Sequence, residues 1–483
     1  MISQTFIAFV AYLTILLIIG VSVHKKSSSE TDFIMGNRGL NFWLTALSAH
    51  ASDMSAWLFM GFPMAIFLGG PAHAWIAIGL VLGMFLNWHF VAPRLRRATE
   101  HYGAYTLSTY FEKRFNDNSG VIRLLTAVMT LLFMTHYLAA GLIAMGLLLE
   151  SVFTLDYYLG ITLATLVTLT YTFVGGYMTV AWMDLFQGLL LIAVIVLVPV
   201  LAYLSLPPEM TITAAAAAQQ IPMALIPDYS SEWIVTTFSL AFGWGVGYFG
   251  MPHILTKFMG INNPSHMYKA KYLGVSWQII ALGAATAVGL VGIAFFPEGL
   301  VNPQLLFVDM VKILFHPLAA GFILCGLLAA NMSTMDSQIL VCASVISEDL
   351  YKSFGGKNAS SERLLRVSRG GVVVISLVAL LIAYQKQTAT VMDTVLYSWA
   401  GLGCTFGPLV LMALFFERTN RFGAIAGVAV GGVFAAIWPT LNPLILPYSI
   451  AATVPGFCLS LLSIWSVSLL TSPKLAVDTT LPQ

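Results

Sequence analysis

Long stretches without a single lysine or arginine recur along the whole 483-residue chain, and they limit its possible folds more than any other feature. Each stretch is roughly 20 residues long, which as an α-helix matches about 30 Å of bilayer hydrocarbon. Only 9% of the residues are charged and 58% are apolar, whereas about 25% of a soluble domain is charged. The chain is therefore predicted to fold in a lipid bilayer.

We interpret thirteen stretches as transmembrane helices. Their approximate limits are 4–23, 40–69, 73–93, 121–149, 157–176, 178–203, 233–256, 272–297, 316–346, 368–385, 391–416, 423–440 and 446–470. Helices satisfy every backbone hydrogen bond within one segment, and the apolar runs lack the two-residue alternation of a transmembrane barrel. The predicted fold class is an all-α polytopic membrane protein with about 13 transmembrane helices.

The basic residues indicate the orientation of these helices, because lysine and arginine collect in cytoplasmic loops. If the N-terminus lies outside, all of the 22 basic residues except Lys312 and Lys386 fall on the cytoplasmic side. The cytoplasmic segments are then 24–39, 94–123, 257–271, 347–369, 417–422 and the tail after residue 470. The first stretch lacks a basic start and a small-residue cleavage site, so we expect it to remain as a helix.

Three carboxylates lie deep inside predicted helices, at Asp53, Asp184 and Asp336. A charged side chain at the bilayer centre costs at least about 2.5–3.5 kcal/mol on insertion scales, so each is a candidate functional residue. The alternative for each is a structural acid that accepts a hydrogen bond from a neighbouring helix. Asp393 and Glu150 lie near helix ends, where we expect them to be interfacial.

Two predicted helices contain residues that interrupt a helix. Segment 48–57 places small and hydroxylated residues around Asp53, and serine and aspartate compete for backbone hydrogen bonds. Five helices later, segment 243–252 contains four glycines and a proline. We expect both helices to break, which frees carbonyl oxygens to bind a cation. For the second segment, the alternative is close helix packing through Gly243 and Gly247.

Interrupted helices at matching places in two five-helix halves are typical of transporters built from inverted repeats, whose binding site lies at the membrane midplane. The predicted organisation is one transmembrane domain, 1–471. It comprises a first helix and loop (4–39), a first repeat (40–232), a second repeat (233–418) and two extra helices (419–471). A short cytoplasmic tail is predicted at 472–483.

A polar run in the ninth predicted helix contains Asn331, Ser333, Thr334 and Asp336. Such hydroxyls often only bond the carbonyl four residues back. Two neutral hydroxyls with freed carbonyls would also suit a hard monovalent cation, because hard cations take oxygen ligands. The sequence has no histidine and cysteine cluster with the spacing of a transition-metal site, so sodium is the cation that such a site suits best.

Several motifs occur along the chain in a recognisable order. They are 45–49 (TALSA), 51–55 (ASDMS), 243–250 (GWGVGYFG), 252–255 (PHIL), 332–334 (MST) and 347–351 (SEDLY), together with Trp182 and Asp184. This set resembles the solute:sodium symporter family and, within it, the bacterial sodium/proline symporters. The resemblance covers essentially the whole chain. It implies a leucine-transporter-type fold of five plus five helices with two discontinuous helices, in a bacterial inner membrane. The charge distribution predicts that the N-terminus lies outside and the C-terminus in the cytoplasm.

The resemblance also implies roles for individual residues. Sodium (Na+) would be held by the carbonyls of Ala51, Met54 and Ala330 and the hydroxyls of Ser333 and Thr334. The substrate positions are Asp53, Ser55, Trp57, Tyr137, Trp244, Tyr248 and Pro252. Aromatic faces suit the apolar ring of a small zwitterion such as L-proline, and helix ends at the breaks favour its carboxylate. Asp184 would lie on the exit route of sodium.

The implied function is sodium-coupled secondary active symport that imports L-proline by alternating access. The alternative is a sodium- or proton-coupled symporter of another small amino acid or organic solute, because the three intramembrane aspartates could relay protons. The implied partners are the solute, sodium and the lipid bilayer, with no nucleic acid and no obligate protein partner.

Two other functional classes fit the sequence less well. A membrane enzyme would need a nucleophile with a partnered histidine or a metal cluster, and the intramembrane serines and aspartates have no such histidine. A channel would need a repeated pore-lining ring. A transporter-derived sensor would need a signalling domain, for which the tail after residue 470 leaves no room.

Four residues depart from the pattern of the proline-transporting relatives. His50 and Ala56 stand where these have glycine, and Met251 stands where they have glutamine. Asp336 replaces a serine of some relatives, although aspartate is common in others. The loss of an amide at position 251 alters the choice of solute if that side chain faces the cavity, and it is neutral if the side chain faces away. His50 is expected to be a packed, hydrogen-bonded histidine and not a proton relay.

Overall fold

The computed structural model describes residues 2–23, 29–227, 230–356, 358–385 and 390–471, so the predicted tail at 472–483 lies outside the described residues. In the described part the regular structure is helical, and one isolated bridge pairs Leu40 with Ile261. The prediction of an all-α fold is confirmed.

Ten helices of the described chain are long and apolar enough to cross a membrane, and a bent pair makes eleven. Nine of the ten are essentially single helices: α1 (Ile2–Val23), α8 (Val121–Phe153), α10 (Tyr177–Leu204), α14 (Met267–Phe295), α16 (Pro317–Ser344), α18 (Ser361–Gln385), α19 (Val391–Phe415), α20 (Arg421–Ile445) and α21 (Thr453–Leu470). The tenth is a continuous unit, Ala56–His101, that contains α4 (Gly61–Gly69), α5 (Trp75–Leu86) and α6 (Ala92–His101).

The predicted number of thirteen is not confirmed, because two predicted spans are not long continuous apolar helices. The span at 40–69 is interrupted, since α3 (Phe42–Met54) ends before the short η2 (Ala56–Leu58) and α4. The span at 157–176 corresponds to α9 (Tyr157–Gly175), of which Tyr157–Thr170 counts only as a shorter apolar helix.

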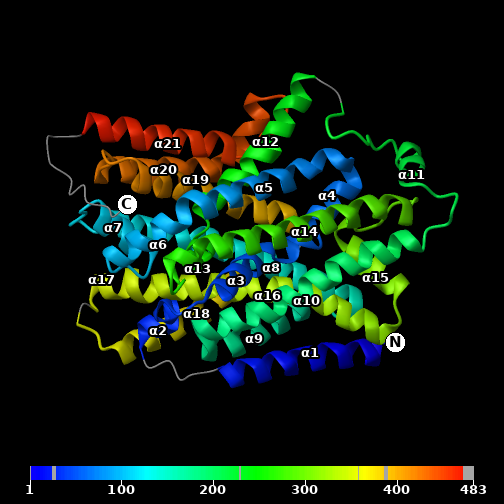
Figure 1. Cartoon of the computed structure of the whole chain (residues 1–483), viewed down its shortest axis with the longest axis horizontal. Coiled ribbons are helices and arrows are strands. Elements are labelled where there is room, and N and C mark those ends of the chain that lie inside the picture. Colours follow the sequence, from blue (N-terminus) through cyan, green and yellow to red (C-terminus); the bar gives the residue numbers. More distant parts are fainter. Residues whose placement is uncertain (1, 24–28, 228–229, 357, 386–389, 472–483) are drawn as a thin grey trace.

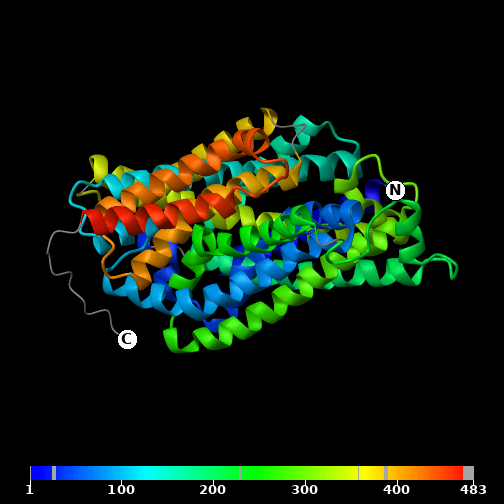
Figure 2. The ribbon, with the colours of Figure 1, turned by 90° about the horizontal axis from the view of Figure 1, so that it is seen from above.

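Most of the helices run along the long axis of the molecule (Figure 1). The short helices α2 (Glu30–Met35), α7 (Leu107–Arg114) and α17 (Lys352–Phe354) lie at one end, and α11 (Ile212–Ala218) lies at the other. In both views α1 begins at the end where α11 lies, and α21 ends at the opposite end (Figure 2). Segments 24–39, 94–123 and 347–369, predicted to share one side of the membrane, thus have helices at the same end of the bundle.

The centre of the bundle is α16, which packs against α1, α3, α8, α10 and α18. Every residue of α16 from Ile323 to Ser344 is buried. The polar run at 329–338 therefore faces protein and not lipid, as expected for polar groups at membrane depth.

Both predicted helix breaks are confirmed. The first lies at Ser55, where α3 ends. At the second, α12 (Ser231–Gly247) is followed by η5 (Tyr248–Gly250) and by α13 (Pro252–Met259), with a bend of 50°. The packing alternative also holds there, because a Cβ at Gly247 would collide with the Trp399 ring and one at Gly243 would lie 3.0 Å from the Ala451 Cβ. Glycine therefore serves both the break and the close approach of α19.

Candidate functional site

The break in α3 is set by the backbone of Ser55, which has φ 43° and ψ −175°. A side chain at positive φ costs of order 1–3 kcal/mol and persists only where its surroundings hold it. Here the Ser55 N–H donates to Thr334 Oγ1 of α16 at 3.0 Å, and Ser55 Oγ accepts from the Trp57 N–H at 3.2 Å. Helix α16 thus holds the end of α3 in place.

Four of the five predicted sodium ligands form one buried group of oxygens between α3 and α16. Ser333 Oγ lies 2.8 Å from the Ala51 carbonyl and 3.0 Å from the Ala330 carbonyl. Thr334 Oγ1 lies 3.1 Å from the same Ala330 oxygen. Met54, the fifth, is the last residue of α3. The hydroxyls donate to these carbonyls here, and a hydroxyl can equally turn its lone pairs toward a cation among the same oxygens.

Asp53 and Tyr248 connect the two helix breaks. The Tyr248 hydroxyl donates to Asp53 Oδ2 at 2.5 Å, and Gln278 Nε2 of α14 donates to the Tyr248 hydroxyl at 2.8 Å. Asn87 Nδ2 donates to the Tyr248 carbonyl at 2.9 Å. The carboxylate predicted at the substrate site is therefore buried within a polar network that holds the broken helices together.

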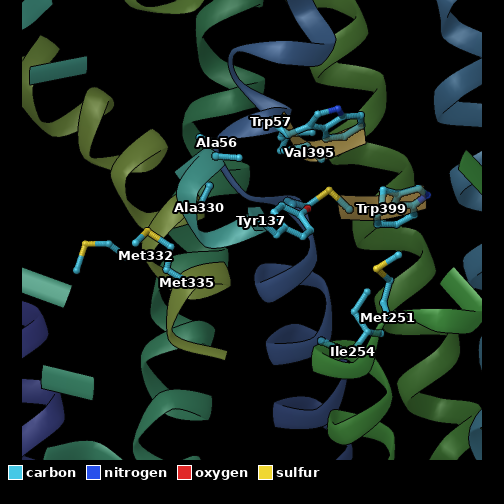
Figure 3. Close-up of a cluster of buried hydrophobic side chains, with 14 of the residues drawn as sticks. Ala56, Trp57, Tyr137, Met251, Ile254, Ala330, Met332, Met335, Val395 and Trp399 are labelled. Atoms are coloured by element: carbon cyan, nitrogen blue, oxygen red, sulfur yellow. The ribbon is translucent and has the colours of Figure 1, made fainter. Parts of the chain in front are cut away.

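Three of the predicted aromatic residues, Trp57, Trp244 and Tyr248, form a continuous cluster with Trp399. The ring centroid of Trp244 lies 5.0 Å from that of Trp57 and 5.5 Å from that of Trp399. Tyr248 meets Trp399 edge to face at 5.1 Å. Figure 3 shows Tyr137 between Ala330 on one side and Trp399 on the other. Ring spacings of 4.5–7 Å are those of favourable aromatic pairs.

Trp399 is a member of the site that the sequence analysis missed. It lies in α19, and its Nε1 donates to the Trp244 carbonyl at 3.2 Å. The signal in the sequence was its place in the run Ser-Trp-Ala-Gly-Leu-Gly at 398–403, where small residues surround one large ring. The glycine at 247 and the tryptophan at 399 are complementary in volume.

Pro252 begins α13 and lines a narrow cavity together with Lys257 and Ser337. The cavity continues to Tyr105 and Thr106, in the end of the bundle that holds α7. Its volume is about 20 Å³, close to the minimum that holds one water molecule. The cavity thus lies between the start of α13 and this end of the protein, and it is narrow.

Asp184 of α10 contacts α3 and α13, where Oδ2 accepts from Ser48 Oγ at 2.5 Å and from Lys257 Nζ at 3.0 Å. Lys257 corrects an expectation, because its segment was placed in a loop at 257–271. The residue is in α13 and is only 1% exposed. The sequence predicted a loop position for Lys257 because this residue immediately follows an apolar stretch. Asp336 Oδ1 accepts from Thr172 of α9 at 3.1 Å, which matches the structural alternative.

The departures from the relatives' pattern are also buried. His50 is packed and hydrogen-bonded, as predicted: its Nε2 accepts from Trp88 Nε1 at 3.1 Å, and the two rings stack. Gly274 provides the space, because a Cβ there would collide with the His50 ring. Met251 is fully buried and lies near Ile254 in the side-chain cluster, on the Trp399 side (Figure 3).

Comparisons with known proteins show which family the chain is similar to. The family model described as "Sodium:solute symporter family" matches residues 33–431. The high-affinity proline transporter PutP of Bacillus subtilis (strain 168) is 39% identical over 471 residues, which is 96% of this chain and 97% of that protein. A sodium/proline symporter of Staphylococcus aureus (strain JH9) is 38% identical over 494 residues, 99% of this chain and 95% of that protein.

One solved structure is similar over nearly the whole fold. It is a substrate-bound, outward-open Na+-coupled sialic acid symporter, with a TM-score of 0.82 and 19% sequence identity. The match covers 97% of this chain and 98% of that one. At this identity the likeness concerns the fold, and it agrees with the leucine-transporter type that the sequence predicts.

Proposed function

The chain belongs to the sodium:solute symporter family, and on that premise we propose that it imports L-proline with sodium by alternating access. As a member of this family it is a multi-pass membrane protein and a sodium-coupled solute symporter, not an enzyme. Sodium is therefore a co-substrate and not a cofactor. The observation that carries the proposal is the buried group of oxygens at Ala51, Ala330, Ser333 and Thr334.

The proposed sodium site joins α3 to α16. A sodium ion among the carbonyls of Ala51, Met54 and Ala330 and the hydroxyls of Ser333 and Thr334 would fix the break of α3, which already bonds to Thr334 through the Ser55 N–H. Asp53 lies in the last turn of α3 before that break, and Trp57 lies directly beyond it. Bound sodium would thus organise the solute cavity, and linkage requires the solute to raise the affinity for sodium by the same factor.

Two observations support proline as the solute. Both relatives named above are described as proline transporters and match nearly the full length of the chain. The site also has the right chemistry: Trp57, Trp244 and Tyr248 offer apolar faces for a five-membered ring. Asp53 offers a negative charge for the ammonium, while Tyr137 and the start of α13 at Pro252 complete the proposed site and favour the carboxylate.

Met251 supports a second candidate, a sodium-coupled symporter of another small amino acid. This fully buried thioether lies where the proline-transporting pattern has an amide, and methionine adapts its shape to irregular gaps. A site changed in this way would accept a different ring or chain. The two candidates share the sodium mechanism and differ only in the solute.

The topology that goes with this function is also a proposal. We place α3 with α4 as one crossing and α9 as another, which brings the number of crossings to the thirteen of the sequence analysis. Residues 40–232 and 233–418 would be the inverted repeats, with a break in the first helix of each. The charge distribution favours an outside N-terminus in a bacterial inner membrane.

Coupling to one sodium ion is sufficient for accumulation. A tenfold sodium gradient supplies about 1.4 kcal/mol and a membrane potential of about 100 mV supplies about 2.3 kcal/mol, which together support roughly 500-fold accumulation.

The test is uptake into proteoliposomes that contain the purified chain and carry an imposed sodium or proton gradient. Labelled proline should accumulate with an inward sodium gradient and not with a proton gradient alone. Uptake driven equally well by protons without sodium would contradict the assignment of sodium as the coupled cation. Sodium-driven uptake of another amino acid, with no uptake of proline, would contradict proline as the solute and favour the second candidate.

A further inference from the structure

Asp184 is surrounded by oxygen atoms and by one ammonium group, all of them buried. Its Oδ2 lies 2.5 Å from Ser48 Oγ, 3.2 Å from Ser52 Oγ and 3.0 Å from Lys257 Nζ. Ser52 Oγ is also 2.9 Å from Ser337 Oγ. In the part of the chain that the structure describes, Asp184 Oδ1 has no hydrogen-bond partner although it is buried. A carboxylate with three nearby hydroxyls is a typical environment for a hard cation.

This Asp184 cluster, formed by Ser48, Ser52, Asp184, Lys257 and Ser337, adjoins the proposed sodium site. Ser52 follows the ligand Ala51, and Ser337 follows the ligand Ser333 by four residues on α16, which is one helical turn and the same face. Ser337 and Lys257 both line the narrow cavity that leads toward the end of the bundle with α7. An ion that leaves the proposed site toward that end meets the cluster first.

The ammonium of Lys257 already supplies the positive charge in this cluster. Both side chains of the Asp184–Lys257 pair are almost fully buried, at 0% and 2% side-chain exposure. Lys257 Nζ also lies 5.3 Å from the centroid of the Tyr177 ring, a favourable position for a cation. A buried carboxylate without a counter-charge is strongly unfavourable, so the Lys257 ammonium stabilises the ionised form of Asp184.

We propose that Lys257 is a tethered cation that occupies a second sodium position at Asp184 and so limits the transporter to one sodium ion per solute molecule. The lysine is a specificity-determining residue, because it decides how many ions are coupled and touches neither the solute nor the proposed ion. This inference rests on the proposed function, since it concerns the stoichiometry of the same symport.

The proposal predicts the behaviour of a neutral residue at this position. In Lys257→Gln, the carboxylate and the serine hydroxyls lose their tethered cation and recruit a sodium ion from solution. Two sodium ions would then couple to each solute molecule. In Lys257→Arg the positive charge is kept, and one sodium ion should suffice. In the double variant Asp184→Asn, Lys257→Gln both charges are absent, and again one ion is expected.

The experiment measures sodium-22 and labelled proline uptake side by side in proteoliposomes, at saturating proline and over a range of sodium concentrations. The expected ratio of sodium to proline is about one for the wild type and the two controls, and about two for Lys257→Gln, and the Hill coefficient for sodium should rise toward the number of sites. A ratio of one in a Lys257→Gln protein that still transports would overturn the proposal, as would a wild-type ratio of two.

A second measurement does not depend on transport. The unfolding temperature of each purified variant is recorded against sodium concentration without solute, because a ligand that binds the folded state stabilises it by mass action. The unfolding temperature of Lys257→Gln should rise more steeply with sodium concentration than that of the wild type or the double variant. Equal slopes would contradict the tethered-cation role. If neither uptake nor stability of the wild type depended on sodium, the proposed function would be wrong. Failure of the tethered-cation role and failure of the proposed function are therefore distinguishable.

Discussion

The hydroxyl of Tyr248, in the break between α12 and α13, donates a hydrogen bond to Oδ2 of Asp53, in the last turn of α3, across 195 residues of sequence. Both side chains are buried, with exposures of 1% and 5%. The two discontinuous helices therefore contact each other through a carboxylate and a phenol at the proposed substrate site. The phenol thus orients the carboxylate that we propose to bind the solute ammonium group.

Removing the Tyr248 hydroxyl should weaken solute binding. In Tyr248→Phe, Asp53 loses its hydrogen bond, and a hydrogen bond to a charged group is worth about 1.5–3 kcal/mol. We expect the proline concentration for half-maximal uptake to rise by about tenfold or more. Tyr268→Phe is the matched control, because Tyr268 is 55% exposed, and it should behave as the wild type. Unchanged affinity in Tyr248→Phe would exclude the contact from the site.

The proposed sodium site can be tested on one helix. Ser333→Ala and Thr334→Ala each remove one oxygen ligand, and each should raise the sodium concentration for half-maximal uptake by about tenfold, which corresponds to about 1.4 kcal/mol. Ser344→Ala is the control, because Ser344 Oγ donates only to the Leu340 carbonyl one turn back on the same helix. Unaltered sodium activation in the double variant Ser333→Ala, Thr334→Ala would place the ion elsewhere.

His50 and Gly274 are expected to be coupled in stability. Gly274→Ala places a methyl group against the His50 ring, and such overpacking costs about 1–3 kcal/mol. In His50→Gly, Gly274→Ala the collision is absent, so the double variant should be more stable than the sum of the single changes allows. Thermal unfolding in detergent measures this coupling. Strictly additive effects would show that the two residues do not share the space.

Glu30 predicts a pH dependence at the end of the bundle where α2 lies. Burial, followed by the nearby negative charge of Glu348, raises the pKa of Glu30 from 4.5 to about 7. The folded protein therefore holds a proton that the unfolded chain releases, so stability should fall as pH rises from about 4.5 to about 7. Lys352, which pairs with Glu348 at 3.0 Å, and Ser347 are the other groups nearby.

Glu30→Gln removes this titration and should flatten the profile of unfolding temperature between pH 5 and pH 8 relative to the wild type. Glu362→Gln is a suitable control, because the Glu362 side chain is 81% exposed. An identical slope in the wild type and Glu30→Gln would assign the pH dependence to other groups.

The sequence predicted the helical fold and both helix breaks because their signals are local. A charge-free stretch of 20 residues, and serine, aspartate, glycine and proline inside such a stretch, act on the backbone where they stand. The number of continuous spans was harder to predict, because hydropathy does not distinguish a straight helix from α3, η2 and α4 in succession.

The site was predictable only in part, because its remaining members are chosen by tertiary contacts. Trp399 joins the aromatic cluster since Gly247 leaves space on another helix. Lys257 is buried since Asp184 and Ser48 lie opposite on α10 and α3. Neither residue carries a local signal that separates it from an ordinary helix residue or a loop lysine.

The central claim is that sodium bound between α3 and α16 prepares the solute site, and equilibrium binding to the purified protein tests it most directly. Labelled proline binding is measured with and without saturating sodium, and sodium binding with and without proline. We predict that sodium lowers the dissociation constant of proline by about 5–150-fold and that proline lowers that of sodium by the same factor. Proline binding of equal affinity in the presence and absence of sodium would contradict the account.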